Sequence, residues 1–291
     1  MNTKAYAKIN LSLDILGRRA DGYHEVRMVM QQLALCDEIT LEMLPDPEIE
    51  LSSSDPSVPS DGRNLMYRAA KLLMESTGLK NGVRMHLEKH IPSAAGLAGG
   101  SADAAAVLTG MNLAAGLGLS REKLMELGVR LGADIPYCIL GGTALSEGIG
   151  EVLTPVSTGI SLPVLLVKPA AGCSTPEVYG AYDRLEEEGM EMLHPDVDAV
   201  LSALEHNSKK ELFRSVGNVL EDVVVPEIPL VSRIRKEMLE NGASTACMSG
   251  SGSTVFGLFE EESLIEQAAE YFKNSKYRAE LSAVISTKFR D

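Results

Sequence analysis

Aromatic residues are scarce in this 291-residue chain, which has no tryptophan and an aromatic fraction of 4%. Aliphatic side chains and methionine must therefore fill its cores. Its four cysteines, Cys36, Cys138, Cys173 and Cys247, lie far apart, with neither a CxxC pair nor a Cys/His cluster. This spacing argues against a structural zinc site and favours reduced thiols in a cytoplasmic protein.

Basic residues are few, because 27 lysines and arginines stand against 41 acidic residues and give a net charge of −14. Such a surface repels a nucleic-acid backbone, and no basic stripe reverses this locally. The first residues alternate polar and apolar side chains instead of forming a signal peptide, and no apolar run is long enough to span a bilayer. We expect a cytoplasmic monomer or weak homodimer that binds small molecules and neither nucleic acid nor membranes.

The pattern of the chain predicts two domains in which strands and helices interleave. Residues 5–16 alternate as a strand, Asn64 can cap a helix that Gly78 ends, and residues 209–222 fit one helix. Residues 45–63 are rich in Pro, Ser and Asp, and we expect an irregular excursion there. Turn residues cluster from 148 to 159, so we place the domain boundary between residues 157 and 158.

The most informative stretch is Pro92–Asp103, PSAAGLAGGSAD, which leads straight into a helical pattern, AAAVLTGMNLAAG. A small-residue loop at a helix N-terminus directs unpaired N–H groups and a positive dipole end at one point, which favours phosphate. The alternative is a glycine-rich turn that only lets two backbones pack closely. The loop lacks the Lys-Ser/Thr of a Walker motif and the dinucleotide-binding arrangement. Ser101 could offer its hydroxyl to phosphate or magnesium, or cap the helix.

Two charged residues are candidates for chemistry. Asp134 follows a helix stop and precedes Ile-Pro, so it is either a general base or an Asx-turn residue. Lys8 lies in an otherwise apolar-alternating strand, where it either solubilises an edge or faces inward toward a negative partner. Tyr23 and His24 lie in the turn after this strand, where a lone histidine is commonly only solvated. The other histidines show no metal-ligand spacing.

Together these pieces resemble the GHMP small-molecule kinases over essentially the full length. The resemblance rests on AYAKINLSLDILGRRADGYHEV, PSAAGLAGGSADAAAVL, LGADIPYC with GGTALSEGIGE, and MSGSGSTVFGLF. The first pattern is the most specific and resembles the branch that phosphorylates a diphosphocytidyl alcohol in the non-mevalonate route to isoprenoid precursors. The resemblance implies an α+β fold, with an N-terminal domain like ribosomal protein S5 domain 2 and a ferredoxin-like C-terminal domain. It also implies ATP as co-substrate and Mg²⁺.

The family's site residues carry over position by position. Lys8 and Asp134 match the catalytic pair, and Asn64 and Lys89 match positions that line the adenine pocket. The ATP phosphate loop corresponds to Pro92, Ser93, Ala94, Ala95, Gly96, Leu97, Ala98, Gly99, Gly100, Ser101 and Ala102. A second glycine loop near the phosphates corresponds to Gly250, Ser251, Gly252 and Ser253. Substrate contacts correspond to Asn10, Tyr23, His24 and Tyr179, with both tyrosines stacking on the cytosine and His24 hydrogen-bonding it.

The chain departs from the family pattern at three positions. Ala98 replaces a common Gly and Ala102 a common Ser, which removes one hydroxyl from the phosphate site, while Glu147 stands where a neutral or basic residue is expected. The expected reaction has Asp134 accepting the hydroxyl proton while Lys8 orients Asp134 and offsets charge. Two alternatives remain: another GHMP kinase acting on homoserine or a mevalonate-type alcohol, and a non-catalytic nucleotide-binding relative.

Overall fold

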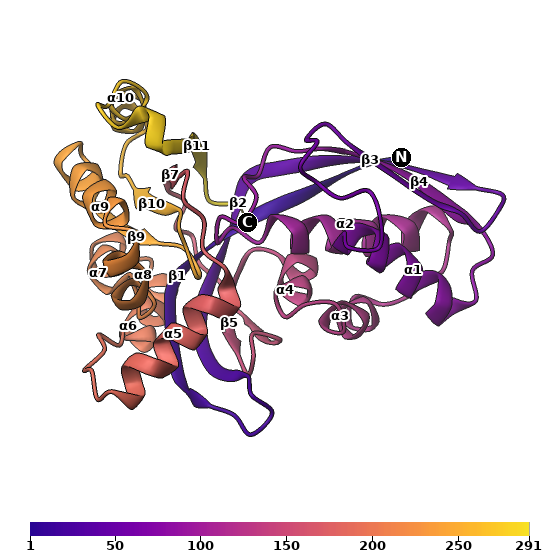
Figure 1. Cartoon of the computed structure of the whole chain (residues 1–291), viewed down its shortest axis with the longest axis horizontal. Coiled ribbons are helices and arrows are strands. Elements are labelled where there is room, and N and C mark those ends of the chain that lie inside the picture. Colours follow the sequence, from indigo (N-terminus) through magenta and orange to yellow (C-terminus); the bar gives the residue numbers. More distant parts are fainter. Residues whose placement is uncertain (291) are drawn as a thin grey trace. The chain divides into compact units, whose positions relative to one another are not determined.

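A computed structural model describes residues 1–290 and divides the chain into two compact units. Unit 1 comprises Met1–Ala7, Leu35–Ser93 and Ala98–Gly141, and unit 2 comprises Lys8–Ala34, Ala94–Leu97 and the residues from Gly142 onward. The long strands β1 (Asn2–Arg18) and β2 (His24–Leu44) supply residues to both units. Figure 1 labels most of the elements, which are numbered in chain order. The domain division at 157/158 stays a prediction, because the compact units alternate along the chain.

Unit 1 is built on the second half of β2, with β4 (Gly82–Glu88) antiparallel to it and β3 (Ile49–Ser53) parallel to β4. A parallel pair needs a crossover, and helix α1 (Leu65–Thr77) provides it. The prediction that residues 45–63 are irregular throughout was wrong, because β3 lies within them. Its short run gains its order from pairing with β4, a non-local contact that local composition does not report.

The helices of unit 1 cover this sheet and enclose an aliphatic core. The Asn64 side chain accepts from the Met66 N–H at the start of α1, and Gly78 ends the helix at φ 71°, as predicted. The core contains residues from β2, β4, α1 and the next helix, among them Ile39, Met85 and Leu108. The remaining helices of unit 1 are α2 (Gly99–Ala114), α3 (Arg121–Val129) and α4 (Asp134–Leu140).

Unit 2 contains a four-stranded antiparallel sheet in the order β11-β7-β10-β9. Its strands are β7 (Pro163–Pro169), β9 (Thr245–Met248), β10 (Val255–Leu258) and β11 (Leu281–Lys288). The other strands of unit 2 belong with β1 and β2: β5 (Thr143–Glu147) pairs with β2, β6 (Val152–Pro155) with β5, and β8 (Gly217–Asn218) with β1.

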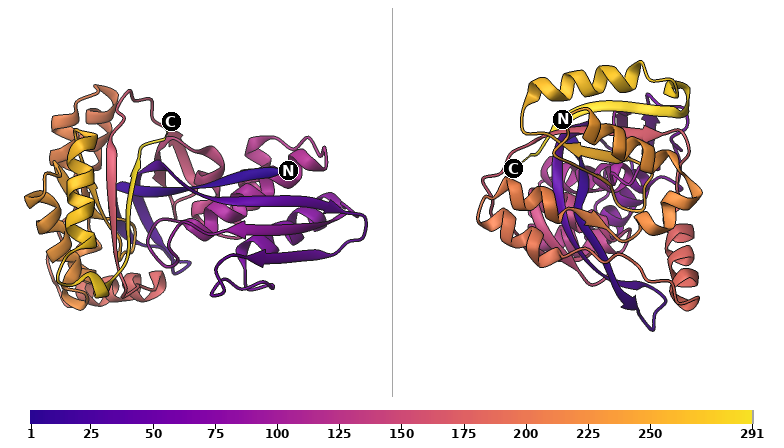
Figure 2. Two further views of the ribbon diagram at one scale, coloured as in Figure 1. Left: turned by 90° about the horizontal axis from the view of Figure 1, so that it is seen from above. Right: turned by 90° about the vertical axis from the view of Figure 1, so that its left-hand side faces the viewer.

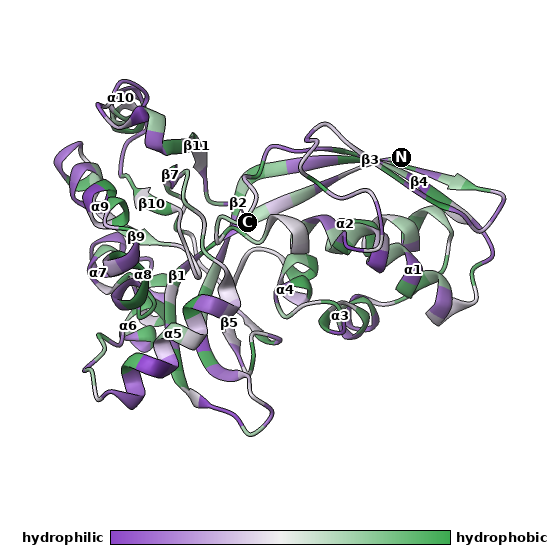
Figure 3. Ribbon diagram, viewed as in Figure 1, coloured by the Kyte–Doolittle hydropathy of each residue, from purple (hydrophilic) through white to green (hydrophobic). Residues whose placement is uncertain are grey.

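The four-stranded sheet of unit 2 is covered by α9 (Leu230–Glu240) and α10 (Glu262–Lys273), which run along it in Figure 2. Figure 3 shows these helices banded in both colours, as expected of amphipathic helices that bury one side. The other helices of unit 2 are α5 (Thr175–Glu187), α6 (Val197–Glu205), α7 (Lys209–Ser215) and α8 (Glu221–Glu227). No helix within residues 1–290 has both the length and the apolar character needed to cross a membrane.

The predicted single helix over residues 209–222 was wrong, since the chain leaves α7 at Ser215 and enters α8 only at Glu221. Between the helices, Gly217 and Asn218 form β8, which pairs in parallel with Ser12 and Leu13 of β1. Strand pairing over some 200 residues of sequence therefore overrides the local helical pattern. This break matters for the site, because it positions Asn218.

Candidate active site

The N-terminus of α2 forms the end of the predicted phosphate loop. The helix begins at Gly99, and its N-cap residue is Ala98, in the left-handed region at φ 56°. Ala98 has no side-chain oxygen to cap the helix, and the first intrahelical bond runs from the Ala102 N–H to the Ala98 carbonyl. The N–H groups of the first turn are therefore oriented to bind an anion. Ser101 lies inside this turn, so its predicted alternative as N-cap was wrong.

The middle of the phosphate loop, residues 94–97, belongs to unit 2 and packs against the second glycine loop. Gly96 has φ 73°, and a Cβ there would collide with the Ser249 carbonyl oxygen. The Ser249 hydroxyl donates to the Gly96 carbonyl at 3.0 Å. Close backbone packing thus occurs at Gly96, and it was the alternative to phosphate binding in the sequence analysis. The N–H groups that follow Ala98 at the start of α2 are still oriented to bind an anion.

The second glycine loop is held by two buried side chains that the sequence did not single out. Asn218 donates from Nδ2 to the carbonyls of Met248 and Gly250, each at 2.8 Å. Glu221 accepts from the Met248 N–H at 2.7 Å and pairs with Arg235 through its other oxygen. Burial raises the pKa of Glu221, and Arg235 and the Met248 N–H partly offset this. These hydrogen bonds fix the backbone of the second glycine loop at Met248 and Gly250.

Lys8 lies in the part of β1 that belongs to unit 2, with only 4% of its surface exposed. Its Nζ donates to Oδ1 of the fully buried Asn10 at 2.8 Å. A solubilising role on an exposed edge is therefore wrong for Lys8. A buried ammonium group is costly unless negative or polar groups face it, which suits a site that receives an anionic substrate.

Asp134 is the first residue of α4 in unit 1, and it is half-buried. The Asx-turn alternative for Asp134 was wrong, because the residue starts a helix whose N-cap is Ala133. A carboxylate in the first turn is stabilised by the helix dipole. Three residues on, burial raises the pKa of the Tyr137 phenol, and the charges of Cys138 and Asp134 raise it further. Tyr137 is thus held as a neutral core residue.

Asn64 and Lys89, predicted to line the adenine pocket, are engaged in structural contacts. The Asn64 amide caps α1 and donates to the Pro59 carbonyl at 2.7 Å. The Lys89 ammonium is buried between two carboxylates, at 2.6 Å from Asp37 and 2.8 Å from Asp103. A Cβ on Gly99 would lie 3.1 Å from Lys89 Nζ, so this ion cluster lies directly beneath the start of α2. A role in binding adenine stays a prediction for both residues.

His24 and Tyr179 lie together in unit 2, with their ring centroids 4.9 Å apart. His24 begins β2, and its Nε2 is 2.6 Å from Oδ1 of Asp183 on α5. The solvated-turn alternative for His24 is wrong, because its side chain is only 9% exposed. The neighbouring Tyr23 is 61% exposed. Asp183 was missed from the sequence, although it lies one helical turn beyond Tyr179 and hence on the same face of α5.

Glu147, which departs from the family pattern, belongs to a surface ion-pair group in unit 2. Its Oε1 lies 3.6 Å from Nε of Arg27, and Arg27 also makes two hydrogen bonds to Asp198 on α6, at 2.6 and 2.9 Å. Glu147 therefore contributes to a link between β2, β5 and α6.

Within residues 1–290 no group of three or more His, Cys, Asp or Glu side chains is placed to hold a metal ion. Mg²⁺ in kinases is held by substrate phosphates together with one or two protein oxygens, and it needs no all-protein cage. The Ser101 hydroxyl, in the first turn of α2, is one oxygen of the required kind.

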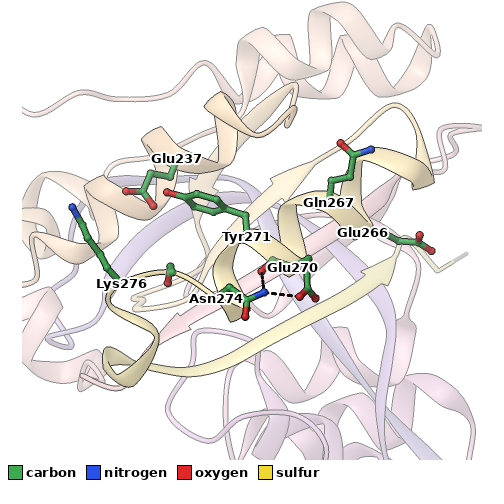
Figure 4. Close-up of a pocket in the computed structure, with 8 residues that line it drawn as sticks. Glu237, Glu266, Gln267, Glu270, Tyr271, Asn274 and Lys276 are labelled. Atoms are coloured by element: carbon green, nitrogen blue, oxygen red, sulfur yellow. Dashed lines mark hydrogen bonds between the residues drawn. The ribbon is translucent and has the colours of Figure 1, made fainter.

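A pocket of about 800 Å³ between α9 and α10 lies apart from every predicted site residue (Figure 4). It is lined by Glu237, Glu266, Gln267, Glu270, Tyr271, Asn274, Ser275 and Lys276. Three of these have local partners, since Asn274 donates to Glu270, and Glu237 accepts from the Tyr277 hydroxyl. The pocket therefore contains none of the residues assigned to the proposed site.

Two family models match the chain. The GHMP kinases N terminal domain matches residues 64–142, and the GHMP kinases C terminal domain matches residues 200–279. The first match contains α2 and Asp134, and the second contains Asn218 and the second glycine loop.

Curated relatives resemble the chain over nearly its full length. The 4-diphosphocytidyl-2-C-methyl-D-erythritol kinase of Geobacillus thermodenitrificans is 48% identical over 268 residues, covering 92% of this chain and 91% of the relative. The kinase of the same name from Caldicellulosiruptor bescii is 45% identical and covers 94% of both. A crystal structure of 4-(cytidine 5'-diphospho)-2C-methyl-D-erythritol kinase matches with a TM-score of 0.82 at 34% identity, over 100% of each chain.

Proposed function

This chain belongs to the 4-diphosphocytidyl-2-C-methyl-D-erythritol kinase family of the GHMP kinases, and on that premise we propose that it phosphorylates the 2-hydroxyl of 4-diphosphocytidyl-2-C-methyl-D-erythritol. The chain is a small-molecule kinase for this substrate and has the α+β GHMP kinase fold. The identity of 48% over 92% of the chain carries this conclusion. The reaction belongs to the non-mevalonate route to isoprenoid precursors.

ATP is the phosphoryl donor used by GHMP kinases, and we place its phosphates at the loop of residues 92–102. The uncapped N–H groups at the start of α2 and the positive end of its dipole support this placement. Mg²⁺, when bound, neutralises charge on the triphosphate, and Ser101 would supply a hydroxyl oxygen to it. Gly250 to Ser253, packed against Gly96 through Ser249, would hold the loop in its phosphate-binding conformation.

The transfer itself is assigned to Lys8 and Asp134. Phosphoryl transfer depends chiefly on positioning and charge stabilisation. Asp134 accepts the proton of the substrate hydroxyl, while Lys8 offsets negative charge on the transferred group. The burial of Lys8 supports this assignment, because electrostatic interactions are stronger away from water.

The cytidine end of the substrate is assigned to the aromatic group of unit 2. Tyr179 and the exposed Tyr23 offer ring faces for stacking, and His24 offers a hydrogen-bonding nitrogen. Asn10, held by Lys8, would contact the polar part of the substrate nearer the reacting hydroxyl.

A coupled assay of ADP release with the diphosphocytidyl substrate tests this function. We expect turnover by the wild type, and a loss of kcat of at least about 100-fold in Asp134→Asn and in Lys8→Ala, with ATP binding retained. Lys4→Ala is the matched control, since Lys4 lies on the same strand but is exposed and paired with Glu38. Near-wild-type turnover in either site variant would contradict the assignment.

A panel of alcohols separates this function from its alternatives. Turnover with homoserine or mevalonate in preference to the diphosphocytidyl substrate would identify another GHMP kinase. Binding of ATP without turnover of any alcohol would identify a non-catalytic nucleotide-binding protein.

A further inference from the structure

The imidazole of His24 is held by a carboxylate that no family motif identified. Its Nε2 lies 2.6 Å from Oδ1 of Asp183, and the two side chains are 9% and 14% exposed. Oδ2 of Asp183 faces Arg18, 3.4 Å from its Nη1. The ring of Tyr182 meets that of His24 edge-on at 6.3 Å, and Tyr179 lies 4.9 Å away. The His24 ring is therefore fixed in position by contacts on several sides.

The chemistry of this pair determines which nitrogen of His24 carries the hydrogen. An ionised carboxylate only accepts hydrogen bonds, so Nε2 must be protonated to bond with Asp183 at this distance. In the neutral imidazole the other nitrogen, Nδ1, then carries a lone pair and acts as an acceptor. The carboxylate of Asp183 thus sets the tautomer of His24, and with it the hydrogen-bonding role of Nδ1.

We propose that Asp183 is a positioning residue that keeps His24 in the Nε2–H tautomer, so that Nδ1 accepts from the 4-amino group of cytosine and rejects uracil. The proposal rests on the proposed function, in which His24 contacts the base. Cytosine carries a donor at its 4-position, whereas uracil carries a carbonyl acceptor there. A lone pair on Nδ1 therefore attracts the first base and repels the second, and buried mismatches of this kind discriminate strongly.

Arg18 makes Asp183→Asn a directed test of the tautomer. The guanidinium of Arg18 lies on the Oδ2 side, so the amide oxygen of the substituted side chain is favoured there. The amide NH₂ then turns to His24 and donates to Nε2. This reverses the tautomer, and Nδ1 becomes a donor that suits the 4-carbonyl of uracil.

The experiment measures the tautomer and the base preference separately. ¹⁵N NMR of histidine-labelled protein reports the protonated ring nitrogen of His24, assigned by the loss of its signal in His24→Gln. We expect Nε2–H in the wild type and Nδ1–H in Asp183→Asn. The ratio of kcat/KM for the diphosphocytidyl substrate over its diphosphouridyl analogue should fall by about tenfold or more, with the KM for ATP unchanged. Glu187→Gln, exposed on the same helix, is the matched control.

The outcomes distinguish the tautomer proposal from the proposed function. A wild type that does not phosphorylate the diphosphocytidyl substrate contradicts the function. An active wild type whose His24 carries its hydrogen on Nδ1 overturns the tautomer proposal, and this result does not depend on the folding of any Asp183 variant. An unchanged ratio in both Asp183→Asn and Asp183→Ala overturns it as well.

Discussion

Next to the N-terminus of α2, Lys89 forms ion pairs with two carboxylates, those of Asp37 and Asp103. Asp37 is fully buried and also accepts from the backbone N–H groups of His90 and Ile91, at 2.6 and 2.7 Å. Asp103 has less support, because its Oδ1 is buried without a hydrogen-bond partner among residues 1–290. Burial, only partly offset by Lys89, raises the pKa of Asp103 to about 7. The surroundings thus stabilise the ionised carboxylate of Asp37 with several hydrogen bonds, whereas the ionised form of Asp103 is stabilised by Lys89 alone.

The raised pKa of Asp103 predicts how this residue changes the free energy of unfolding with pH. Its folded-state pKa of about 7 lies above the usual aspartate pKa of about 3.9. Between these values the folded protein keeps a proton that the unfolded chain has released, so this contribution to stability falls as the pH rises from about 4 to about 7. Asp103→Asn lacks the titrating group and should lack this loss, with a difference on the order of a few kcal/mol.

Urea unfolding of the wild type and Asp103→Asn at pH 5 and pH 8 measures that difference. Asp46→Asn, exposed in the same unit, controls for the other carboxylates. If wild type and Asp103→Asn lose stability in parallel across this range, Asp103 is ionised throughout in the folded protein and the interpretation fails.

The residues that the sequence did not identify share one property, which is that their partners are distant along the chain. Asp183 meets His24 across 159 positions, and Asp37 meets Lys89 across 52. Neither pairing can be read from local composition. Lys8 and Asp134 were found from their local sequence context and from the family motifs that contain them, but the sequence left the burial of Lys8 open.

At the scale of elements, β8 and the start of α8 act together as a support for the second glycine loop. Asn218 ends β8 and Glu221 begins α8, and between them they bind the N–H of Met248 and the carbonyls of Met248 and Gly250. Ser249 then bonds to Gly96 of the phosphate loop. Asn218 and Glu221, which lie outside both glycine-rich loops, therefore help to fix the backbone conformation of both loops.

Removing this support should be measurable in stability and in ATP binding. Asn218→Ala leaves two buried carbonyls without their donor, and we expect a loss of about 1–3 kcal/mol in the free energy of unfolding. We also expect a higher KM for ATP, because the loop beside Gly96 loses its anchor. Ser232→Ala is the control, because Ser232 lines the same pocket as Asn218 but its side chain is exposed. A loss no larger than that of Ser232→Ala would refute the supporting role.

Elements with local signals were predictable, and elements that depend on distant pairing were not. Asn64 and Gly78 mark helix ends through a capping side chain and backbone freedom, and the structure confirms both. The helix α4 was missed because Pro136 lies within it, two residues after its start, where a missing N–H costs little. The strands β3 and β8 exist through their partners β4 and β1.

At the scale of the whole molecule, each compact unit is built from stretches that are not consecutive in the sequence. Residues 8–34 belong to the same compact unit as the chain from Gly142 onward, whereas residues 35–93 belong to the other. Within unit 2, β5 pairs with Met28 to Gln31, and the backbone of Phe289 bridges to Leu33. A residue near the end of the described chain thus bridges to a strand that begins near the N-terminus.

This interleaving predicts that a cut between residues 157 and 158 does not yield two independently folding pieces. The fragment 1–157 would lack β8, the partner of β1, and everything that packs on residues 8–34 within unit 2. Expressed alone, it should melt without a cooperative transition, and mixing it with fragment 158–291 should restore one. Cooperative melting of the isolated 1–157 fragment, followed by circular dichroism, would contradict this expectation and support a domain boundary at that point.

The alternation of the two units also constrains recombination between relatives of this kinase. Membership changes at five junctions along the chain, after residues 7, 34, 93, 97 and 141. A chimera made by a single crossover therefore always inherits at least one unit of mixed parentage. Exchanging either unit intact requires all five crossovers, including two that isolate the four residues of Ala94–Leu97 inside the phosphate loop.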